Sequence, residues 1–556
     1  MTAESVGKVI RPADIGLKRE MGLIGACWAS MTSLIGSGWL FGSWKGAFST
    51  GTSAILAWVI AGIAIIILAL IHAELGGMYP VSGGTARFPH FAFGSIAGVS
   101  FGFFSWVQAV TVAPIECFAV MQYLAYYWHG LFNTSTGEVT GLGFGMSVVL
   151  LALFTGLNFF AMRLFNKINS GITWWKIAIP VAAIIILFTQ FHTTNFNSHG
   201  GFTPYGWKAM FAAIPGAGIV FAYLGFEQAD QLAGEIKNPQ RNLPRAIIYA
   251  ILIATAIYVL LQVVFIGALK PGELSHGWAA LSTNSSLELG PLAFIAGAAG
   301  IAWFATVLRV DAFISPSGTG LIYQTSTSRI GYGLSRNRYY PPFFGWVDKR
   351  GIPWFSLILA FVFGLVFLLP FPSWSSLVGL VTSASVLMYA GAPLSLGALR
   401  KQVPDAPRPY RAPGAAVLAP LAFVISSLII YFSGFDTIWK LGIVLVIGYF
   451  LIGIWMAIDK QRPPLDWKAA QWLPVYLIGM GIISWQGQYC SSGPAGPGAS
   501  CSATARIPFW WDFLIVAGFS LGIFLWAQAV RAPRQEVLDL VARQSGEQEP
   551  TPPASH

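Results

Sequence analysis

The chain has 556 residues, of which 55% are hydrophobic and only 10% are charged, and its formal net charge is +10. Soluble domains carry roughly a quarter of charged residues, so this composition excludes an ordinary soluble domain. Apolar runs of membrane-spanning length recur along the sequence, for example at 53–74, 172–191, 246–269 and 355–371. The sequence therefore predicts an all-α integral membrane protein with about 14 transmembrane helices.

The predicted spans divide the chain into successive segments. A short segment (1–20) precedes two groups of five spans, 21–200 and 201–400, and two further spans at 401–460. Two additional spans follow at 461–531, and then a polar tail at 532–556, which we expect to be disordered apart from a short helix at 536–543. The third and eighth apolar runs, 95–128 and 291–328, are long enough for tilted helices.

Basic residues fall mostly on one side of this topology. On the other side lie Lys45, Lys208, Lys270, Lys440 and Arg506. By the positive-inside rule, both termini are predicted to be cytoplasmic in a multi-pass protein of the inner (plasma) membrane. The net positive charge is then a topology signal, which makes membrane lipid the expected partner and needs no nucleic acid.

Two of the four cysteines are candidates for a disulfide. Cys490 and Cys501 flank a loop rich in Gly, Ser and Pro on the predicted outer side, where an oxidising compartment would favour pairing. The alternative is a pair of free thiols. Cys27 and Cys117 lie inside apolar spans and are expected to pack there.

Glycines cluster near the middle of two spans. The first span contains Ile35-Gly36-Ser37-Gly38, and the sixth contains Gly216 and Gly218, followed by the segment 221–227. Such clusters weaken a transmembrane helix. Interrupted helices at matching positions of two halves indicate an inverted-repeat transporter, here a LeuT-like fold with five-plus-five helices and discontinuous first and sixth helices. The alternative is close packing between helices, which also uses small residues.

A break in a membrane helix also creates a polar site. The N-terminus of a half-helix favours a carboxylate, and the freed carbonyl groups favour an ammonium group. A site with both properties suits a zwitterion such as a free amino acid.

Three segments carry a resemblance to a known family. These are IGSG (35–38), AELGGMYPVSGG (73–84) and FAYLGFEQADQLAGEIKNPQRNLPRAI (221–247). Over residues 15–460 the chain resembles the permeases of the amino acid–polyamine–organocation (APC) superfamily. The two additional spans and the RVDAF segment (309–313) are similar to the bacterial aspartate/glutamate–proton symporters.

The resemblance implies a substrate site at the two breaks. The backbone of Ile35, Gly36, Ser37 and Gly38 would receive the substrate carboxylate. In the sixth span, carbonyl groups of Phe221, Ala222 and Leu224 would receive the amino group, with Tyr223 and Gly225 in the same segment.

Three charged residues inside spans are candidates for proton coupling, because ionisable groups are costly in hydrocarbon. Lys176 aligns with a family lysine that takes the place of a sodium ion, and a titrating amine there would couple proton movement to transport. The alternative is a lysine that extends to the interface. Glu116 and Glu227 are predicted relay groups, and the alternative for Glu116 is a neutral acid bonded to a neighbouring helix.

Arg309 lies deep in the eighth span. Arginine suits bidentate recognition of carboxylates, so we predict that Arg309 binds the side-chain carboxylate of an acidic substrate. The alternative is a structural pair with Asp311 or Glu116. Residues two apart on a helix do not face each other, which disfavours the pair with Asp311.

The predicted function is therefore a secondary active transporter that imports amino acids, with the proton as coupling ion and aspartate or glutamate as substrate. The alternatives are exchange or proton-coupled transport of neutral or cationic amino acids or polyamines, and, more remotely, a transporter-like nutrient sensor. The sequence has no P-loop for ATP, no metal-ligand spacing and no nucleophile elbow. We expect no enzymatic activity, no cofactor and no metal.

Overall fold

The computed structural model describes residues 19–81, 83–159, 162–197, 199–369, 373–490, 493–494 and 503–544. In these ranges the chain is almost entirely helical. The α-helices are α1 (Leu23–Leu34), α2 (Ser37–Thr50), α3 (Ala54–Met78), α4 (Gly84–Leu124), α5 (Gly141–Leu157), α6 (Met162–Phe188), α7 (Gly206–Gly216), α8 (Ile219–Ala222), α9 (Gln228–Gln231), α10 (Pro239–Ala268), α11 (Ser285–Glu288), α12 (Pro291–Ala298), α13 (Ala302–Arg336), α14 (Trp354–Leu368), α15 (Trp374–Gln402), α16 (Ala415–Phe432), α17 (Phe435–Ile458), α18 (Trp467–Ala470), α19 (Trp472–Gln486), α20 (Trp511–Ala529) and α21 (Arg534–Gln544). The last of these contains the short helix predicted in the tail.

Two small antiparallel ladders and several short 3-10 helices add to the α-helices; the 3-10 helices are Gly51–Ser53, His129–Leu131, Thr193–Phe196, Ala233–Glu235, Pro271–Leu274, Trp278–Thr283 and Pro342–Gly345. Strands β1 (Phe132–Asn133) and β2 (Glu138–Val139) pair with Phe132 opposite Val139. Strands β3 (Tyr489–Cys490) and β4 (Gly493–Pro494) pair with Tyr489 opposite Pro494. Both ladders lie in connections between apolar helices.

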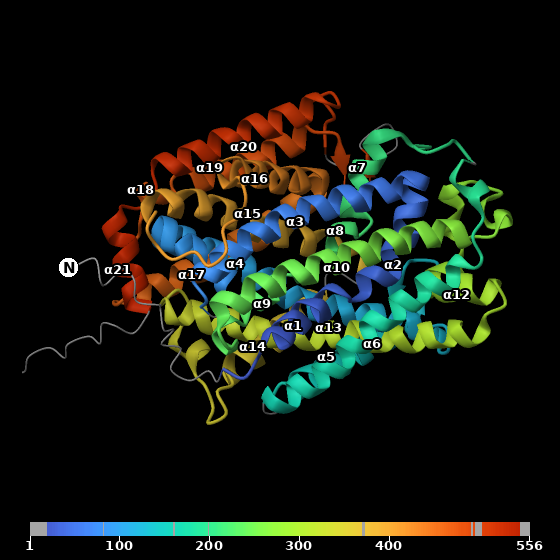
Figure 1. Ribbon diagram of the computed structural model, residues 1–556, viewed down its shortest axis with the longest axis horizontal. Helices are drawn as coiled ribbons and strands as arrows, with labels where there is room; N and C mark the ends of the chain where they lie inside the picture. The colour runs from blue at the N-terminus through green and yellow to red at the C-terminus, as the bar shows by residue number, and fades with distance from the viewer. Residues whose placement is uncertain are drawn as a thin grey trace, which may run out of the picture.

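Apolar helices dominate the molecule and run along its long axis (Figure 1). Eight helical segments of the described chain are long and apolar enough to cross a membrane, and four shorter apolar helices accompany them. Large apolar side chains point outward from these helices, including Val446 and Phe450 on α17 and Leu525 on α20. An exposed apolar surface of this extent fits lipid rather than water, so the fold is that of a multi-pass membrane protein.

Helix α4 is the central element, because it packs against α13, α14, α15 and α5 and its apolar window is completely buried. It begins at Gly84, before the predicted start of the third span at residue 95. A left-handed glycine, Gly94 (φ 76°), marks a kink, and the adjacent Ser95 amide donates to Asp466 Oδ2 at 2.8 Å. The predicted eighth run, 291–328, is divided in the structure, since α12 ends at Ala298 and α13 starts at Ala302.

Both glycine clusters break their helices, as expected. Helix α1 ends at Leu34 and α2 begins at Ser37, with Ile35 in a non-helical conformation (φ −87°, ψ 72°). Helix α7 ends at Gly216 and α8 begins at Ile219, and the left-handed Gly218 (φ 77°) stands between them. The two broken segments pack against each other, because α2 contacts α7 and α8 while α1 contacts α9.

Ion pairs with buried carboxylates gather at one end of the molecule, which we call the basic end. Arg329 Nε lies 2.9 Å from Glu235 Oε1, and both side chains are at most 5% exposed. Glu74 accepts two hydrogen bonds from Arg400, at 2.6 and 2.9 Å. The opposite end, which we call the far end, holds the start of α7 and the β3–β4 ladder (Figure 1).

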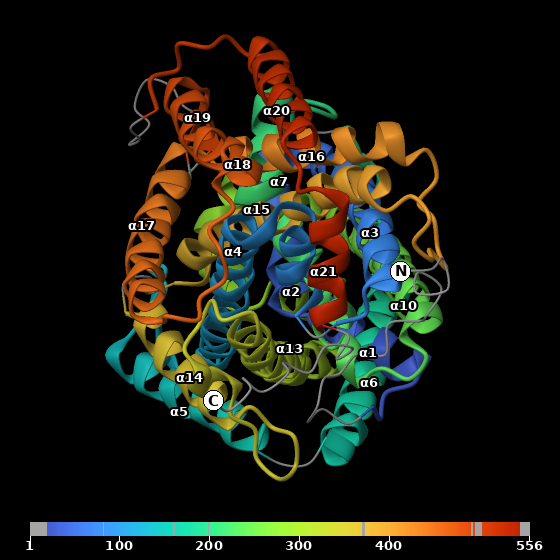
Figure 2. The same cartoon turned by 90° about the vertical axis from the view of Figure 1, so that its left-hand side faces the viewer.

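The carboxy-terminal helices lie at the side of this bundle. Figure 2 shows α19 and α20 at the top, above α16, with α17 at the left edge and α21 below them. Helix α20 packs against α16, α15 and α19.

Candidate functional site

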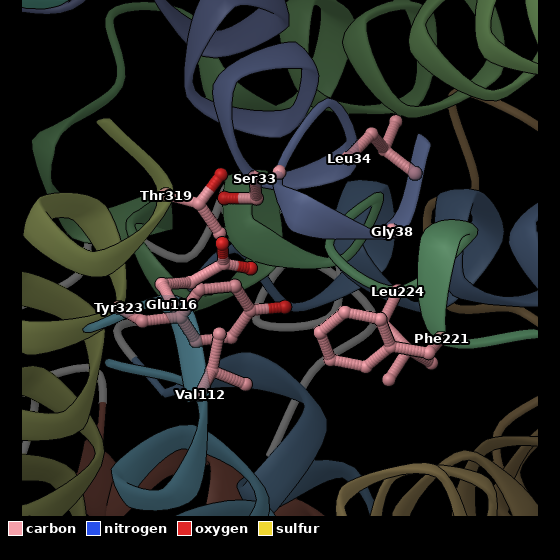
Figure 3. Close-up of a pocket in the computed structure, with 10 residues that line it drawn as sticks. Ser33, Leu34, Gly38, Val112, Glu116, Phe221, Leu224, Thr319 and Tyr323 are labelled. Carbon is pink, nitrogen blue, oxygen red and sulfur yellow. The ribbon is translucent and has the colours of Figure 1, made fainter. Parts of the chain in front are cut away.

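A small cavity lies where the two broken helices meet α4 and α13 (Figure 3). It is lined by Ser33, Leu34, Gly36, Gly38, Val112, Glu116, Phe221, Leu224, Thr319 and Tyr323. All of these residues are buried, so the conformation is closed to both ends. The space left inside it, about 10 Å³, is that of about one water molecule, so the cavity must widen before an amino acid can occupy it.

Glu116 supplies the charge in this cavity. Its carboxylate Oε2 accepts the backbone N–H of Ser37 at 2.9 Å, and Oε1 is buried and has no hydrogen-bond partner among the described residues. Ser37 is the first residue of α2, so the carboxylate sits at a helix N-terminus, where the helix dipole favours negative charge. The side chain of Glu116 thus occupies the place that the sequence predicts for the substrate carboxylate.

Gly36 makes room for this contact. A Cβ atom at Gly36 would lie 2.6 Å from Glu116 Oε1 and 2.9 Å from Thr319 Oγ1. Such distances are too short for real contacts, so any larger residue would push both polar groups away. The glycine lets the backbone of the first break approach two side chains from different helices.

Lys176 joins three elements beside the cavity. Its Nζ donates to the carbonyl of Thr32 at 2.5 Å, to the carbonyl of Ser315 at 2.8 Å and to Thr319 Oγ1 at 2.8 Å. All three donors of the ammonium group are used, and the side chain is 0% exposed. The alternative of a lysine extending to the interface is therefore wrong. Thr32 lies in the last turn of α1, where the helix dipole favours a cation.

The second break forms the other wall of the cavity. Phe221 and Leu224 line it, and Gly38 of α2 packs closely against α8, because a Cβ there would lie 2.7 Å from Ala222 Cα. Tyr223 points elsewhere, since its hydroxyl donates to the carbonyl of Trp58 at 3.0 Å.

Trp374 of α15 connects the two walls. Its Nε1–H donates to Ser37 Oγ at 2.7 Å, and its ring lies edge-on to Phe221 with 5.6 Å between centroids. A second aromatic contact joins it to Phe41 of α2 at 5.0 Å. This residue, which the sequence did not single out, fastens both broken helices to α15.

Glu227 lies in a separate polar network. Its Oε2 accepts the hydroxyl of Tyr389 at 2.6 Å and the amide of Gly225 at 3.0 Å. It is 0% exposed and is absent from the residues that line the cavity. Tyr323, which does line the cavity, accepts from Gln108 Nε2 at 3.3 Å.

Arg309 and Asp311 contact different residues. The guanidinium Cζ of Arg309 lies 3.7 Å above the ring centroid of Tyr126, a cation–π contact. Asp311 Oδ1 accepts from Trp175 Nε1 and from Ser315 Oγ, both at 2.8 Å. Within the described ranges no ion pair links Arg309 to either carboxylate proposed for it, and Arg309 is absent from the cavity lining.

Of the predicted substrate-site residues, four line the cavity, namely Gly36, Gly38, Phe221 and Leu224. Ser37 reaches it through its amide. The structure places Ile35, Ala222, Tyr223, Gly225 and Arg309 outside the lining. Sequence reasoning missed Ser33, Leu34, Val112, Thr319 and Tyr323. Thr319 and Tyr323 were detectable as polar residues one turn apart on α13, and Lys176 faces the same helix.

Cys490 is disulfide-bonded, while Cys27 and Cys117 are free. Cys501 lies outside the described residues, so the pairing of Cys490 with Cys501 stays a prediction.

A site between two broken membrane helices, with helix termini directed at a small closed cavity, is the arrangement found in secondary transporters. The comparisons with known proteins agree. The amino acid permease family model matches residues 21–455, and the chain belongs to this family, as its motifs predicted.

Several relatives extend over nearly the whole chain. The glutamate/serine transporter AimA of Bacillus subtilis is 36% identical over 92% of this chain and 94% of its own length. The aspartate-proton symporter of the same organism is 36% identical over 94% of this chain and 98% of its own. The branched-chain amino acid permease BcaP is 25% identical over 78% and 93%. The family and these relatives are transporters rather than enzymes, and the chain is an amino acid transporter.

Proposed function

We propose that the chain imports acidic amino acids together with protons, by alternating access through a LeuT-like fold. In this proposal 14 spans cross the inner membrane with both termini inside, and residues 21–200 and 201–400 form the two inverted repeats. The observation that carries it is the bond between the Glu116 carboxylate and the Ser37 amide inside a closed cavity.

That bond makes the cavity's own carboxylate a competitor of the substrate. An amino acid needs the same half-helix N-terminus for its α-carboxylate. Two carboxylates at one site repel each other, and the low dielectric of the surroundings strengthens the repulsion. A proton on Glu116 removes its charge and weakens its bond to Ser37, because charge-assisted hydrogen bonds are about twice as strong as neutral ones. Proton and substrate would therefore enter together.

Lys176 supplies the second part of the proposed coupling. Its ammonium group joins the end of α1 to α13 through Thr32, Ser315 and Thr319. Loss of a proton removes one donor and the positive charge, which loosens this junction. Because Thr319 also lines the cavity, a change in the protonation of Lys176 would alter the substrate site.

Two substrate classes have specific support. The relatives named as glutamate/serine and aspartate-proton transporters favour acidic amino acids, and Arg309 would meet the side-chain carboxylate in a conformation other than this one. A small neutral amino acid such as serine is the second candidate. The cavity favours it, since the charged group in its lining is a carboxylate, which would repel an acidic side chain.

Uptake into proteoliposomes tests the proposal. Purified protein would be assayed with radiolabelled L-aspartate, L-glutamate and L-serine, with and without an inward proton gradient, beside Lys176→Ala. Gradient-stimulated aspartate uptake supports the proposal, and Lys176→Ala should then exchange substrate without responding to the gradient. If the protein takes up serine but neither aspartate nor glutamate, the acidic substrate class is wrong and a small neutral amino acid is the substrate. Uptake that ignores the proton gradient in the wild type would overturn the coupling.

A further inference from the structure

At the far end, α20 and the connection between α19 and α20 contact the second broken helix. Phe211 of α7 stacks on Phe432 at the end of α16, with 5.2 Å between ring centroids. The same ring meets Phe513 of α20 edge-on at 4.9 Å. Phe432 and Phe513 touch each other at 5.3 Å, so three elements share one aromatic cluster.

A polar chain runs beside this cluster. Lys208 Nζ of α7 donates to Gln488 Oε1 at 2.7 Å. The backbone N–H of Gln488 donates to the Tyr431 hydroxyl at 3.0 Å, and that hydroxyl donates to Asp512 Oδ2 of α20 at 3.2 Å. The start of α7 is thereby connected to both the connection after α19 and the first turn of α20.

The β3–β4 ladder completes the attachment. Tyr489 of β3 packs edge-on against Tyr431 and Phe432, and β4 contacts α7 directly. The next residue, Cys490, is disulfide-bonded. Phe211, Lys208 and β4 therefore hold α7 from one side, and we call these contacts the α7 clamp.

What the clamp holds is one wall of the cavity. Helix α7 continues through Gly218 into α8, where Phe221 lines the cavity. Gly218 adopts a left-handed conformation that other residues avoid, so the chain can bend there at low cost. In this closed conformation α7 also contacts α2, the corresponding half of the first broken helix.

We infer that α19, α20 and their disulfide-bonded connection form a brace that keeps α7 in the closed position, and that opening of the far end breaks the α7 clamp. The brace sets the balance between closed and open conformations without touching the substrate. This role goes beyond the proposed function and holds whichever amino acid is carried. It also assigns a function to the two additional helices.

A cysteine in the cavity would report the opening. Val112→Cys replaces a lining residue with one of similar size, and a membrane-impermeant maleimide would be applied to each face of oriented vesicles, with no substrate and no gradient. The chain without this substitution gives the background from Cys27, which is partly buried. Labelling would be compared in the background of Phe211→Ala and of Lys208→Ala, and the milder Lys208→Ala keeps the test available if Phe211→Ala folds poorly.

Phe355→Ala is the matched control, because Phe355 of α14 meets Phe343 edge-on at 4.9 Å between ring centroids, outside α7, α19 and α20. We expect the clamp variants to raise the labelling rate about fivefold from the far-end face only, and the control to leave it unchanged. Wild-type rates in both clamp variants would overturn the inference. An equal rise in Phe355→Ala, or a rise from both faces in the clamp variants, would do so as well, since it would indicate general loosening. Because no transport is measured, failure of the coupling proposal leaves this result interpretable.

Discussion

Glu116 is the residue on which the proposed mechanism depends. Glu116→Gln keeps the size and one acceptor oxygen for the Ser37 amide but removes the charge and the titration. We expect substrate exchange to persist while stimulation by a proton gradient falls to about the background level, because the neutral state is now permanent. The measurement is aspartate uptake and exchange in proteoliposomes. Glu138→Gln, at an exposed position of β2, is the control; a Glu116→Gln variant that still responds fully to the gradient would contradict the role.

Arg309 gives a prediction about specificity. If its guanidinium leaves Tyr126 to bind the substrate side chain, Arg309→Ala loses a charge-assisted hydrogen bond of about 1.5–3 kcal/mol. Aspartate affinity should then fall about tenfold or more, while serine affinity changes little. Tyr126→Leu removes the cation–π partner but keeps the charge of Arg309. It should leave the affinity for aspartate equal or higher. Competition binding with both amino acids measures this, and equal losses for aspartate and serine would assign Arg309 a structural role.

At the scale of helices, the breaks depend on glycines that no other residue can replace. Gly36→Ala places a methyl group against Glu116 and Thr319, and Gly38→Ala places one 2.7 Å from Ala222 Cα. Overpacking of this kind costs about 1–3 kcal/mol. We therefore expect both variants to lose at least about tenfold in uptake. Gly25→Ala in α1 meets only an ordinary contact at 3.6 Å from Met21 Cβ. Normal uptake in this control would show that the losses come from the break and not from any glycine substitution in the helix.

The same helices show what the sequence could predict. The helix breaks have a local cause, namely the glycine clusters inside apolar runs. The ends of α1 and α7 could therefore be predicted from the sequence. The bond between Ser37 and Glu116 joins positions 79 residues apart, and no local pattern encodes it. The start of α4 at Gly84 was missed because residues 84–94 are less apolar than a typical span, yet they are buried against protein. The role of the polar residues on α13 could not be predicted, because it depends on Lys176, which is distant in the sequence and lies beside them in the structure.

At the scale of the whole molecule, the closed cavity is held from two ends. At the far end the α7 clamp fixes one broken helix. At the basic end Glu235, which follows α9, pairs with Arg329 of α13, and its carbonyl accepts the amide of Met21 before α1 at 2.9 Å. Both broken helices are therefore fastened to the rest of the bundle on both sides of the cavity, and alternating access requires that one set of contacts opens while the other holds.

The Glu235–Arg329 pair can be tested with the same cavity cysteine. Removing one partner of a buried pair costs about 3–5 kcal/mol, because the other charge stays buried without compensation. The double substitution Glu235→Gln with Arg329→Gln removes both charges and avoids this penalty. We expect it to raise maleimide labelling of Val112→Cys about fivefold from the basic-end face and not from the other, the mirror image of the clamp variants. The exposed pair Arg534–Asp405 supplies the control, since surface pairs contribute about 0–1 kcal/mol and its neutralisation should change nothing. Labelling that rises from the far-end face in the double variant would mean that the two ends do not open independently, and the closed cavity would then be one cooperative unit rather than a chamber with two gates.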